Sequence, residues 1–152
     1  MTLKFPDLVS GWQELELAQA PVVVHASLSS LGRVEGGAAI LVQSLRQVFP
    51  AVLAPTFTYK SMLTPRVGPP GNGMEYGTGT DQNQMAEFFT PDMPADALIG
   101  QVPEALRLHP NARRSLHPIL SFAGVNAEKY LSAQTHTEPL APLRVMAEDN
   151  GW

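Results

Sequence analysis

The sequence predicts an α/β fold in which a mixed, partly parallel sheet is flanked by helices on both faces (α/β/α). Three β-branched valines at residues 22–24 follow Pro21, and they indicate a buried strand over residues 22–25. A second apolar run at residues 51–54 follows a helical pattern over residues 38–49 that ends before Pro50. A strand, a helix and a strand joined by a short return loop imply a parallel pair with a right-handed crossover.

The remaining elements follow from apolar spacing, capping residues and helix breakers. We expect a short or broken helix within residues 5–18, a helix at 99–107, a turn at 109–112, a strand at the end of 113–125, a helix at 126–133 capped by Asn126, and a short helix at 143–149. Residues 60–97 are rich in proline and glycine and form a long irregular loop in this scheme. Such loops are functional lids or surface insertions without a role, and both alternatives stay open.

Composition indicates a single domain over residues 1–152. The chain is 44% hydrophobic and 16% charged, so it can form a packed core and is not a disordered segment. Its net charge of −4 argues against a nucleic-acid partner, which needs a basic surface. It contains no cysteine, and no two histidines have the spacing of zinc ligands on one helix face, so we expect no metal site.

The chain lacks the sequence features of export and of membrane insertion. Residues 1–11 have no charged start followed by an apolar core, as a signal peptide would have. No apolar run approaches the roughly 20 residues that cross a bilayer. We therefore expect a cytoplasmic protein with no membrane partner.

Small polar residues and glycines follow the first predicted strand and precede the next helix. A strand, a small polar turn and a helix can direct backbone N–H groups at an anion, which suggests a phosphate-bearing cofactor. The spacing from Gly32 to Gly36 and Gly37 matches neither common nucleotide-binding motif, so an ordinary glycine turn is the alternative. Thr56 and Thr58 follow the second strand and should lie at the same sheet edge, where ligands of parallel sheets bind.

Three blocks of sequence occur in a specific order. They are His25-Ala26-Ser27-Leu28-Ser29-Ser30-Leu31-Gly32-Arg33-Val34-Glu35-Gly36-Gly37, then Pro55-Thr56-Phe57-Thr58, and then a third block over residues 89–123 that contains Arg114-Ser115-Leu116-His117-Pro118 and Ser121-Phe122-Ala123. Together they resemble the first half of the aminoglycoside 3-N-acetyltransferase family. Ala26 stands where that family has a serine, Ile119–Leu120 where a polar pair is common, and Ala141 where a serine is usual.

The resemblance implies an acyltransferase that moves the acetyl group of acetyl-CoA to the 3-amino group of an aminoglycoside, a reaction that confers antibiotic resistance. It also implies a groove for the cofactor, formed by Ser27, Leu28, Ser29, Ser30, Gly32, Arg33 and Val34, with Thr56 and Arg114 as further candidates. Family members continue beyond the position of Trp152 into a segment with the histidine taken as general base. We therefore assign no catalytic residue and expect the chain to be truncated, without the C-terminal half of the domain.

Two other functions stay open. The chain could be a non-catalytic half-domain that binds CoA, or nothing, and works with a partner chain. It could also acetylate a different amine, with the acceptor determined by residues 60–97. An incomplete sheet would expose an apolar edge, which predicts poor solubility or a homodimer.

The basic side chains have structural interpretations beside the functional ones. We interpret His25 as a hydrogen-bonded structural residue and His117 as a packing residue, with a positioning role beside the cofactor as the alternative. His109 and His136 lie in polar turns and should be solvated. Arg114 is either a cofactor ligand or, with Arg113, half of a solvated pair.

Overall fold

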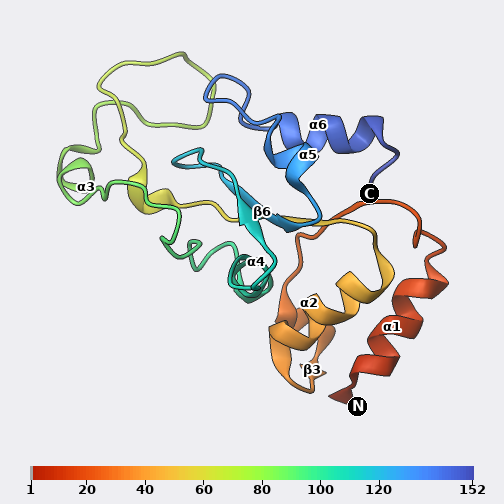
Figure 1. Cartoon of the computed structure of the whole chain (residues 1–152). Coiled ribbons are helices and arrows are strands. Elements are labelled where there is room, and N and C mark those ends of the chain that lie inside the picture. Colours follow the sequence, from red (N-terminus) through yellow and green to blue (C-terminus); the bar gives the residue numbers. More distant parts are fainter. Residues whose placement is uncertain (1) are drawn as a thin grey trace.

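The computed structural model describes residues 2–152 and contains a four-stranded mixed sheet with the strand order β2-β4-β6-β5 (Figure 1). The strands are β2 (Val22–Val23), β4 (Val52–Pro55), β5 (Arg113–Arg114) and β6 (Phe122–Val125). β2 and β4 run parallel, whereas β6 is antiparallel to both of its neighbours. This mixed sheet confirms the predicted fold class and the predicted parallel pair.

Helices cover both faces of the sheet, and β4 shows why. Val52 and Ala54 belong to one apolar cluster and Ala51 and Leu53 to the other, because successive strand residues point to opposite faces. Helices α1 (Phe5–Glu14), α2 (Gly37–Val48) and α4 (Gln101–Arg107) supply the first cluster. Helices α5 (Glu128–Leu131) and α6 (Ala141–Glu148) supply the second, on the other side of the sheet in Figure 1.

Most helices and strands lie close to the residues predicted for them from apolar spacing, but one predicted helix cap is wrong. Asn126 has a φ of 54° and is not the N-cap of α5, a position that Ala127 takes. Its side-chain amide donates a hydrogen bond to the carbonyl of Pro50 at 3.1 Å. Asn126 therefore makes the left-handed turn between β6 and α5, a conformation that asparagine tolerates better than most residues.

Residues 60–97 are less irregular than the sequence suggests. They contain the end of the 3₁₀ turn η2 (Tyr59–Ser61) and the short helix α3 (Thr80–Gln84). The side chain of Asn83 bonds both the N–H and the carbonyl of Thr64, each at 2.8 Å. The ends of the segment join the body through hydrogen bonds from the Glu87 N–H to the Lys60 carbonyl and from the Asp96 N–H to the Phe57 carbonyl. Local hydrogen bonds thus tie parts of this loop to one another and to the body of the domain.

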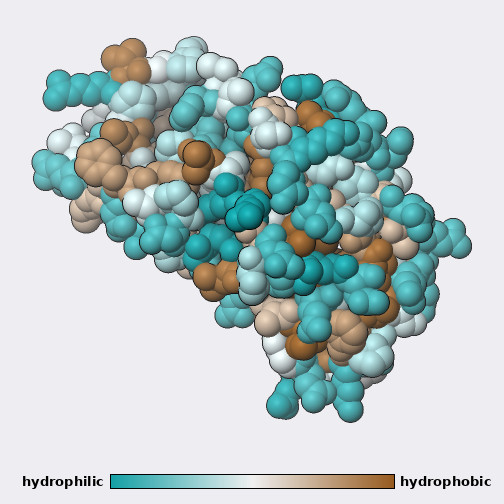
Figure 2. Space-filling model, viewed as in Figure 1, coloured by the Kyte–Doolittle hydropathy of each residue, from teal (hydrophilic) through white to brown (hydrophobic). Residues whose placement is uncertain are grey.

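Exposed apolar side chains gather on the same segment. Figure 2 shows brown side chains over the loops around α3, and the exposed large apolar residues there include Leu63, Val67, Met85 and Phe88. A second, parallel pair of strands lies at the opposite end of the molecule, where β1 (Thr2–Leu3) pairs with β3 (Arg33–Val34). Within residues 2–152, no helix is both long enough and apolar enough to cross a bilayer.

Candidate cofactor-binding site

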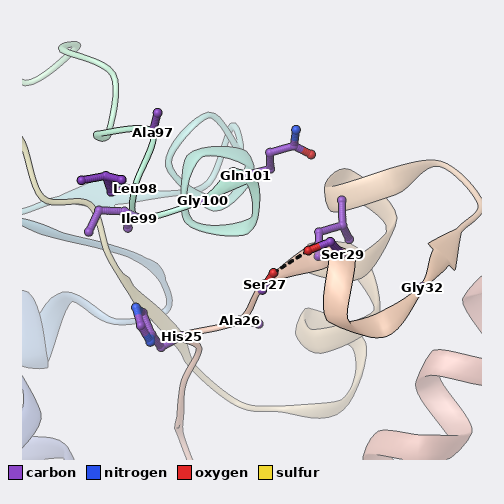
Figure 3. A pocket seen from close by; sticks show the side chains of 11 residues that line it. His25, Ala26, Ser27, Ser29, Gly32, Ala97, Leu98, Ile99, Gly100 and Gln101 are labelled. Carbon is purple, nitrogen blue, oxygen red and sulfur yellow. Dashed lines mark hydrogen bonds between the residues drawn. The ribbon is translucent and has the colours of Figure 1, made fainter.

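A cavity of about 700 Å³ lies beyond the carboxyl end of β2. One wall is the segment that follows this strand, and the other is the segment that leads into α4 (Figure 3). The lining residues are His25, Ala26, Ser27, Leu28, Ser29 and Gly32 on one side and Ala97, Leu98, Ile99, Gly100 and Gln101 on the other. The position agrees with the general rule that ligands of α/β sheets bind beyond the carboxyl ends of parallel strands.

The first wall is a 3₁₀ turn, η1 (Leu28–Leu31), that leaves its serines in solvent. Leu28 and Leu31 are half-buried against the core and hold the turn in place. The hydroxyl groups of Ser27 and Ser29 are 2.8 Å apart and exposed at the cavity, as Figure 3 shows. Gly32 ends the turn with a φ of 77°, a conformation that favours glycine. This wall therefore offers two hydroxyl groups to a ligand.

The second wall depends on Gly100. It has a φ of 102° and a ψ of 174°, a conformation essentially restricted to glycine. Ile99 is buried beside it, and its N–H donates to the Asp96 carbonyl at 2.9 Å. Leu98 is 86% exposed and offers an apolar surface to the cavity. None of the residues predicted for the site lies in this wall, although a glycine before a helix was a usable signal.

The structure brings only part of the predicted groove together. Ser27, Leu28, Ser29 and Gly32 line the cavity, whereas Ser30 is exposed on the same turn outside it. Arg33 and Val34 form β3 and line a separate hollow next to β1. Gly36, the N-cap of α2, also lies at that hollow. The predicted turn between strand and helix is therefore divided, because η1 and the short strand β3 both lie between β2 and α2.

Thr56 does not reach the cavity. Its side chain is fully buried, and its hydroxyl donates to the Ser121 carbonyl at 3.2 Å. Its own carbonyl accepts a hydrogen bond from Arg114 Nη2 at 2.7 Å. Thr56 thus joins β4 to the residues before β6.

Arg114 also lies away from the cavity and ties three segments together. Its Nη1 donates to the carbonyls of Pro91 and Met93, and its Nε donates to Ser121 Oγ at 3.1 Å. The guanidinium lies 5.2 Å from the ring centre of Phe89. Burial, followed by the nearby Arg107, lowers the pKa of Arg114 to about 10, so it stays charged at neutral pH. It is therefore not part of a solvated pair, although Arg113 is exposed.

Glu104 makes a second connection to the same loop. Its carboxylate accepts hydrogen bonds from the Ala95 N–H at 3.0 Å and from Arg107 Nη2 at 2.6 Å. The hydrogen bond from Arg107, ahead of the Ala95 N–H, lowers the pKa of Glu104 against the opposing effect of burial. Arg114 and Glu104 thus hold residues 91–95, which lead directly into the second wall of the cavity.

The histidines differ from their sequence interpretations in two cases. His25 is exposed on the cavity wall and forms no hydrogen bond with the part of the chain that the structure describes, so its structural interpretation is wrong. His109 is not simply solvated, because its Nε2 lies 2.6 Å from Arg46 Nη1. Burial and the Arg46 charge lower the pKa of His109.

His117 has the packing role that the sequence suggested. Its Nδ1 accepts hydrogen bonds from the backbone N–H groups of Ile119 and Leu120, at 3.2 and 3.0 Å. Burial, with a smaller contribution from His136, lowers the pKa of His117. Among residues 2–152, no group of three or more acidic or histidine side chains is placed to bind a metal ion.

Comparison with known proteins gives consistent results. A family model described as aminoglycoside 3-N-acetyltransferase matches residues 23–152. A curated relative, the SPbeta prophage-derived aminoglycoside N(3')-acetyltransferase-like protein YokD of Bacillus subtilis (strain 168), is 30% identical over 111 residues, which are 71% of this chain and 40% of the relative.

Two solved structures share the fold. AAC-IIIb in binary complex with CoASH has a TM-score of 0.71 at 24% identity, over 94% of this chain and 56% of that chain. AAC-VIa bound to sisomicin has a TM-score of 0.73 at 23% identity, over 99% of this chain and 58% of that chain. The chain thus spans little more than half the length of these structures. From the match of the family model to residues 23–152, we conclude that the chain belongs to the aminoglycoside 3-N-acetyltransferase family.

Proposed function

We propose that this chain is the acetyl-CoA-binding part of an N-acetyltransferase that acetylates the 3-amino group of an aminoglycoside. The cavity beyond β2 is the observation that carries the proposal, because Ser27, Leu28, Ser29 and Gly32 line it together. These are residues that the family resemblance assigned to the cofactor. The CoA complex of a relative with the same fold adds support.

The chemistry of the cavity fits this cofactor. None of the lining residues is acidic, so the phosphates of CoA would meet no opposing carboxylate there. Leu28, Leu98 and Ile99 offer apolar surface for the pantetheine chain, and the serine hydroxyls offer donors and acceptors for its amide groups. Arg33 is exposed directly after Gly32 and is our candidate for the phosphates, although it lines the neighbouring hollow.

The transfer step also needs a base and an oxyanion donor. The acceptor amine must lose a proton as it attacks the thioester, and the carbonyl oxygen must be stabilised as it gains charge. Ser27 and Ser29 are our candidates for the oxyanion donor. His25 is the one lining side chain that could accept a proton from the amine, but the family resemblance attributes the base to a segment that follows the position of Trp152. We therefore assign no catalytic base to this chain.

A non-catalytic CoA-binding module is the second candidate. The scarcity of ionisable groups in the cavity favours it, because His25 is the only titratable side chain in the lining. An enzyme of this family with a different amine substrate is the third candidate. The acceptor is tested by comparing sisomicin, which a relative binds, with simple amines.

Calorimetry with acetyl-CoA tests the cofactor site. Ala97 lines the cavity, whereas Ala147 is also exposed, on α6, and does not line it. We expect Ala97→Trp to weaken binding about tenfold or more by filling the cavity, and Ala147→Trp to leave it unchanged. Equal binding by both variants would refute this location for the cofactor.

Release of free CoA thiol in the presence of acetyl-CoA and sisomicin tests the reaction. We expect binding of the cofactor without turnover by this chain. Turnover would show that the base lies within the chain, with His25 as the first candidate. If the chain shows no binding and no turnover, the proposed function is refuted.

A further inference from the structure

Two asparagines with exposed side chains are each followed by a glycine, at Asn72–Gly73 and at Asn150–Gly151. The first pair lies on the long loop before α3 in Figure 1, and the second lies just after α6. An asparagine before a glycine is chemically reactive, because the glycine nitrogen can attack the side-chain amide without hindrance from a Cβ. Each pair therefore depends on whether that nitrogen is free and on which groups contact the amide.

The two glycine nitrogens are in different environments. The N–H of Gly151 donates to the Met146 carbonyl at 2.8 Å, a hydrogen bond that closes the end of α6. The N–H of Gly73 donates no hydrogen bond among residues 2–152. A nitrogen that is held as a donor in a helix cap cannot turn towards the side chain that precedes it. Asn150 is therefore protected from attack, whereas Asn72 is not.

The amide of Asn72 is held at both of its polar atoms. Its Oδ1 accepts a hydrogen bond from the Met74 N–H at 3.1 Å, and its Nδ2 donates to the Tyr76 hydroxyl. The Met74 N–H polarises the side-chain carbonyl and stabilises the negative charge that its oxygen gains under attack. The Tyr76 hydroxyl lies at the nitrogen that must leave, where it can donate a proton. The loop thus places an oxyanion donor and an acid on the same amide.

The position of Tyr76 is set by the backbone around it. A Cβ at Gly68 would overlap the Tyr76 ring, so the ring packs directly on the bare backbone there. The N–H of Gly77 donates to the Pro65 carbonyl at 3.2 Å and joins the two arms of the loop. Tyr76 is half-buried, whereas Asn72 is exposed. The hydroxyl is therefore held beside an amide that water can reach.

We propose that Asn72 is a site of self-modification, at which the loop converts this asparagine to aspartate and isoaspartate. The Gly73 nitrogen loses its proton to water and forms a bond to Asn72 Cγ. The Cγ–Nδ2 bond then breaks as the Tyr76 hydroxyl donates a proton, ammonia leaves, and a cyclic imide remains. The tyrosine regains its proton from the solvent. Water adds to either imide carbonyl and opens the ring.

The modification changes the charge of the long loop. A neutral amide becomes a carboxylate, so the product is one unit more negative than the native chain, whose net charge is −4. The Asn72 Nδ2 that donates to Tyr76 is lost, so the hydrogen bond between these two side chains is lost with it. The reaction needs only the loop and water, and it does not depend on the proposed function.

Mass spectrometry of the incubated native chain tests the proposal without any variant. The exchange of an amide for an acid changes the peptide mass, and fragmentation identifies the asparagine that reacted. At neutral pH we expect Asn72 to react at least about tenfold faster than Asn150, which must first break the Gly151 hydrogen bond. In urea, the two rates should become similar. Equal rates in the folded chain, or no reaction at Asn72, would overturn the proposal.

Tyr76→Phe tests the hydroxyl as the acid. The variant should slow the reaction of Asn72 about tenfold. Gly68→Ala should slow it as well, because the added methyl displaces the Tyr76 ring. Tyr59→Phe is the matched control and should leave the rate unchanged, because the Tyr59 hydroxyl forms no hydrogen bond within residues 2–152. An unchanged or faster reaction in Tyr76→Phe would contradict the proposed role of the hydroxyl.

A synthetic peptide of residues 70–76 separates the contribution of the structure from that of the sequence. The peptide contains the same asparagine, glycine and tyrosine, but nothing holds the hydroxyl and the Met74 N–H at the amide. We expect Asn72 to react about tenfold faster in the folded chain than in the peptide. A folded chain that reacts no faster than the peptide would show that the surrounding groups do not assist the reaction, and would overturn the proposal.

Discussion

At the residue scale, Arg114 is the side chain on which the position of the long loop depends most directly. It reaches the carbonyls of Thr56, Pro91 and Met93 from β5, so one guanidinium joins the sheet to the end of the 60–97 segment. Hydrogen bonds from a charged donor contribute more to stability than neutral ones. The half-buried guanidinium keeps its charge because its carbonyl partners replace the hydrogen bonds to water that burial removes.

Replacing Arg114 should therefore loosen the loop and destabilise the fold. We expect Arg114→Met to lower the free energy of unfolding in urea by roughly 2 kcal/mol, since several carbonyls lose a donor. Hydrogen exchange should rise in residues 91–101. Arg113→Met is the matched control, because that neighbouring side chain is exposed, and it should change neither quantity. Unchanged exchange in the Arg114 variant would contradict its role in positioning the cavity wall.

At the scale of elements, two glycines differ in what the backbone demands. Gly11 lies inside α1, and a Cβ there would meet open space. Gly100 precedes α4 with a positive φ, and its position shapes the cavity wall. Glycine therefore destabilises the interior of α1, whereas the backbone before α4 requires it.

Alanine substitutions should consequently act with opposite sign. Gly11→Ala should raise the stability by about 0.5–1 kcal/mol, because alanine has the higher helix propensity. Gly100→Ala should lower it by about 1–2 kcal/mol, because the side chain strains a left-handed backbone. Thermal unfolding of both variants measures the difference. Two shifts of the same sign would refute this assignment of backbone roles.

The junction of α5 and α6 depends on one carboxylate. Asp149, at the end of α6, accepts hydrogen bonds from Lys129 Nζ and from the Tyr130 hydroxyl. The Lys129 bond, followed by the Tyr130 bond, lowers the pKa of Asp149 below the usual 3.8. A carboxyl whose folded pKa is lowered contributes stability above its unfolded pKa and loses it as the pH falls through the folded value.

We therefore expect Asp149→Asn to lower the free energy of unfolding at neutral pH. Below pH 3.8, the free energy of unfolding of this variant should fall less steeply than that of the native chain. Urea unfolding across the acid range measures both effects. Glu148→Gln, which removes only an exposed pair with Arg144, serves as the control. An acid profile identical to that of the native chain would contradict the role of Asp149.

At the scale of the whole molecule, we expect the edge of β2 to promote self-association of the isolated chain. Val22 and Val23 are half-buried, and the Val23 carbonyl and His25 N–H have no partner within residues 2–152. Unpaired strand edges with apolar flanks promote association. The β5 edge of the sheet is less prone to association, because that strand carries two arginines where β2 carries two valines.

Sedimentation at increasing concentration tests the prediction of self-association. We expect the average mass to rise with concentration for the isolated chain. A monomer at all concentrations would contradict the prediction.

Local pattern was sufficient for the parallel pair, for α2, and for the turn of Ser27 and Ser29 at the end of β2. The information for these elements lies in residues close together in the chain, where apolar spacing and glycine act directly. Only the tertiary structure placed Ala97–Gln101 in the cavity wall and Thr56 and Arg114 outside the cavity. It also showed that Trp152 forms hydrogen bonds with Pro21 and Val23. Each depends on contacts between segments far apart in sequence, whose packing no local spacing encodes.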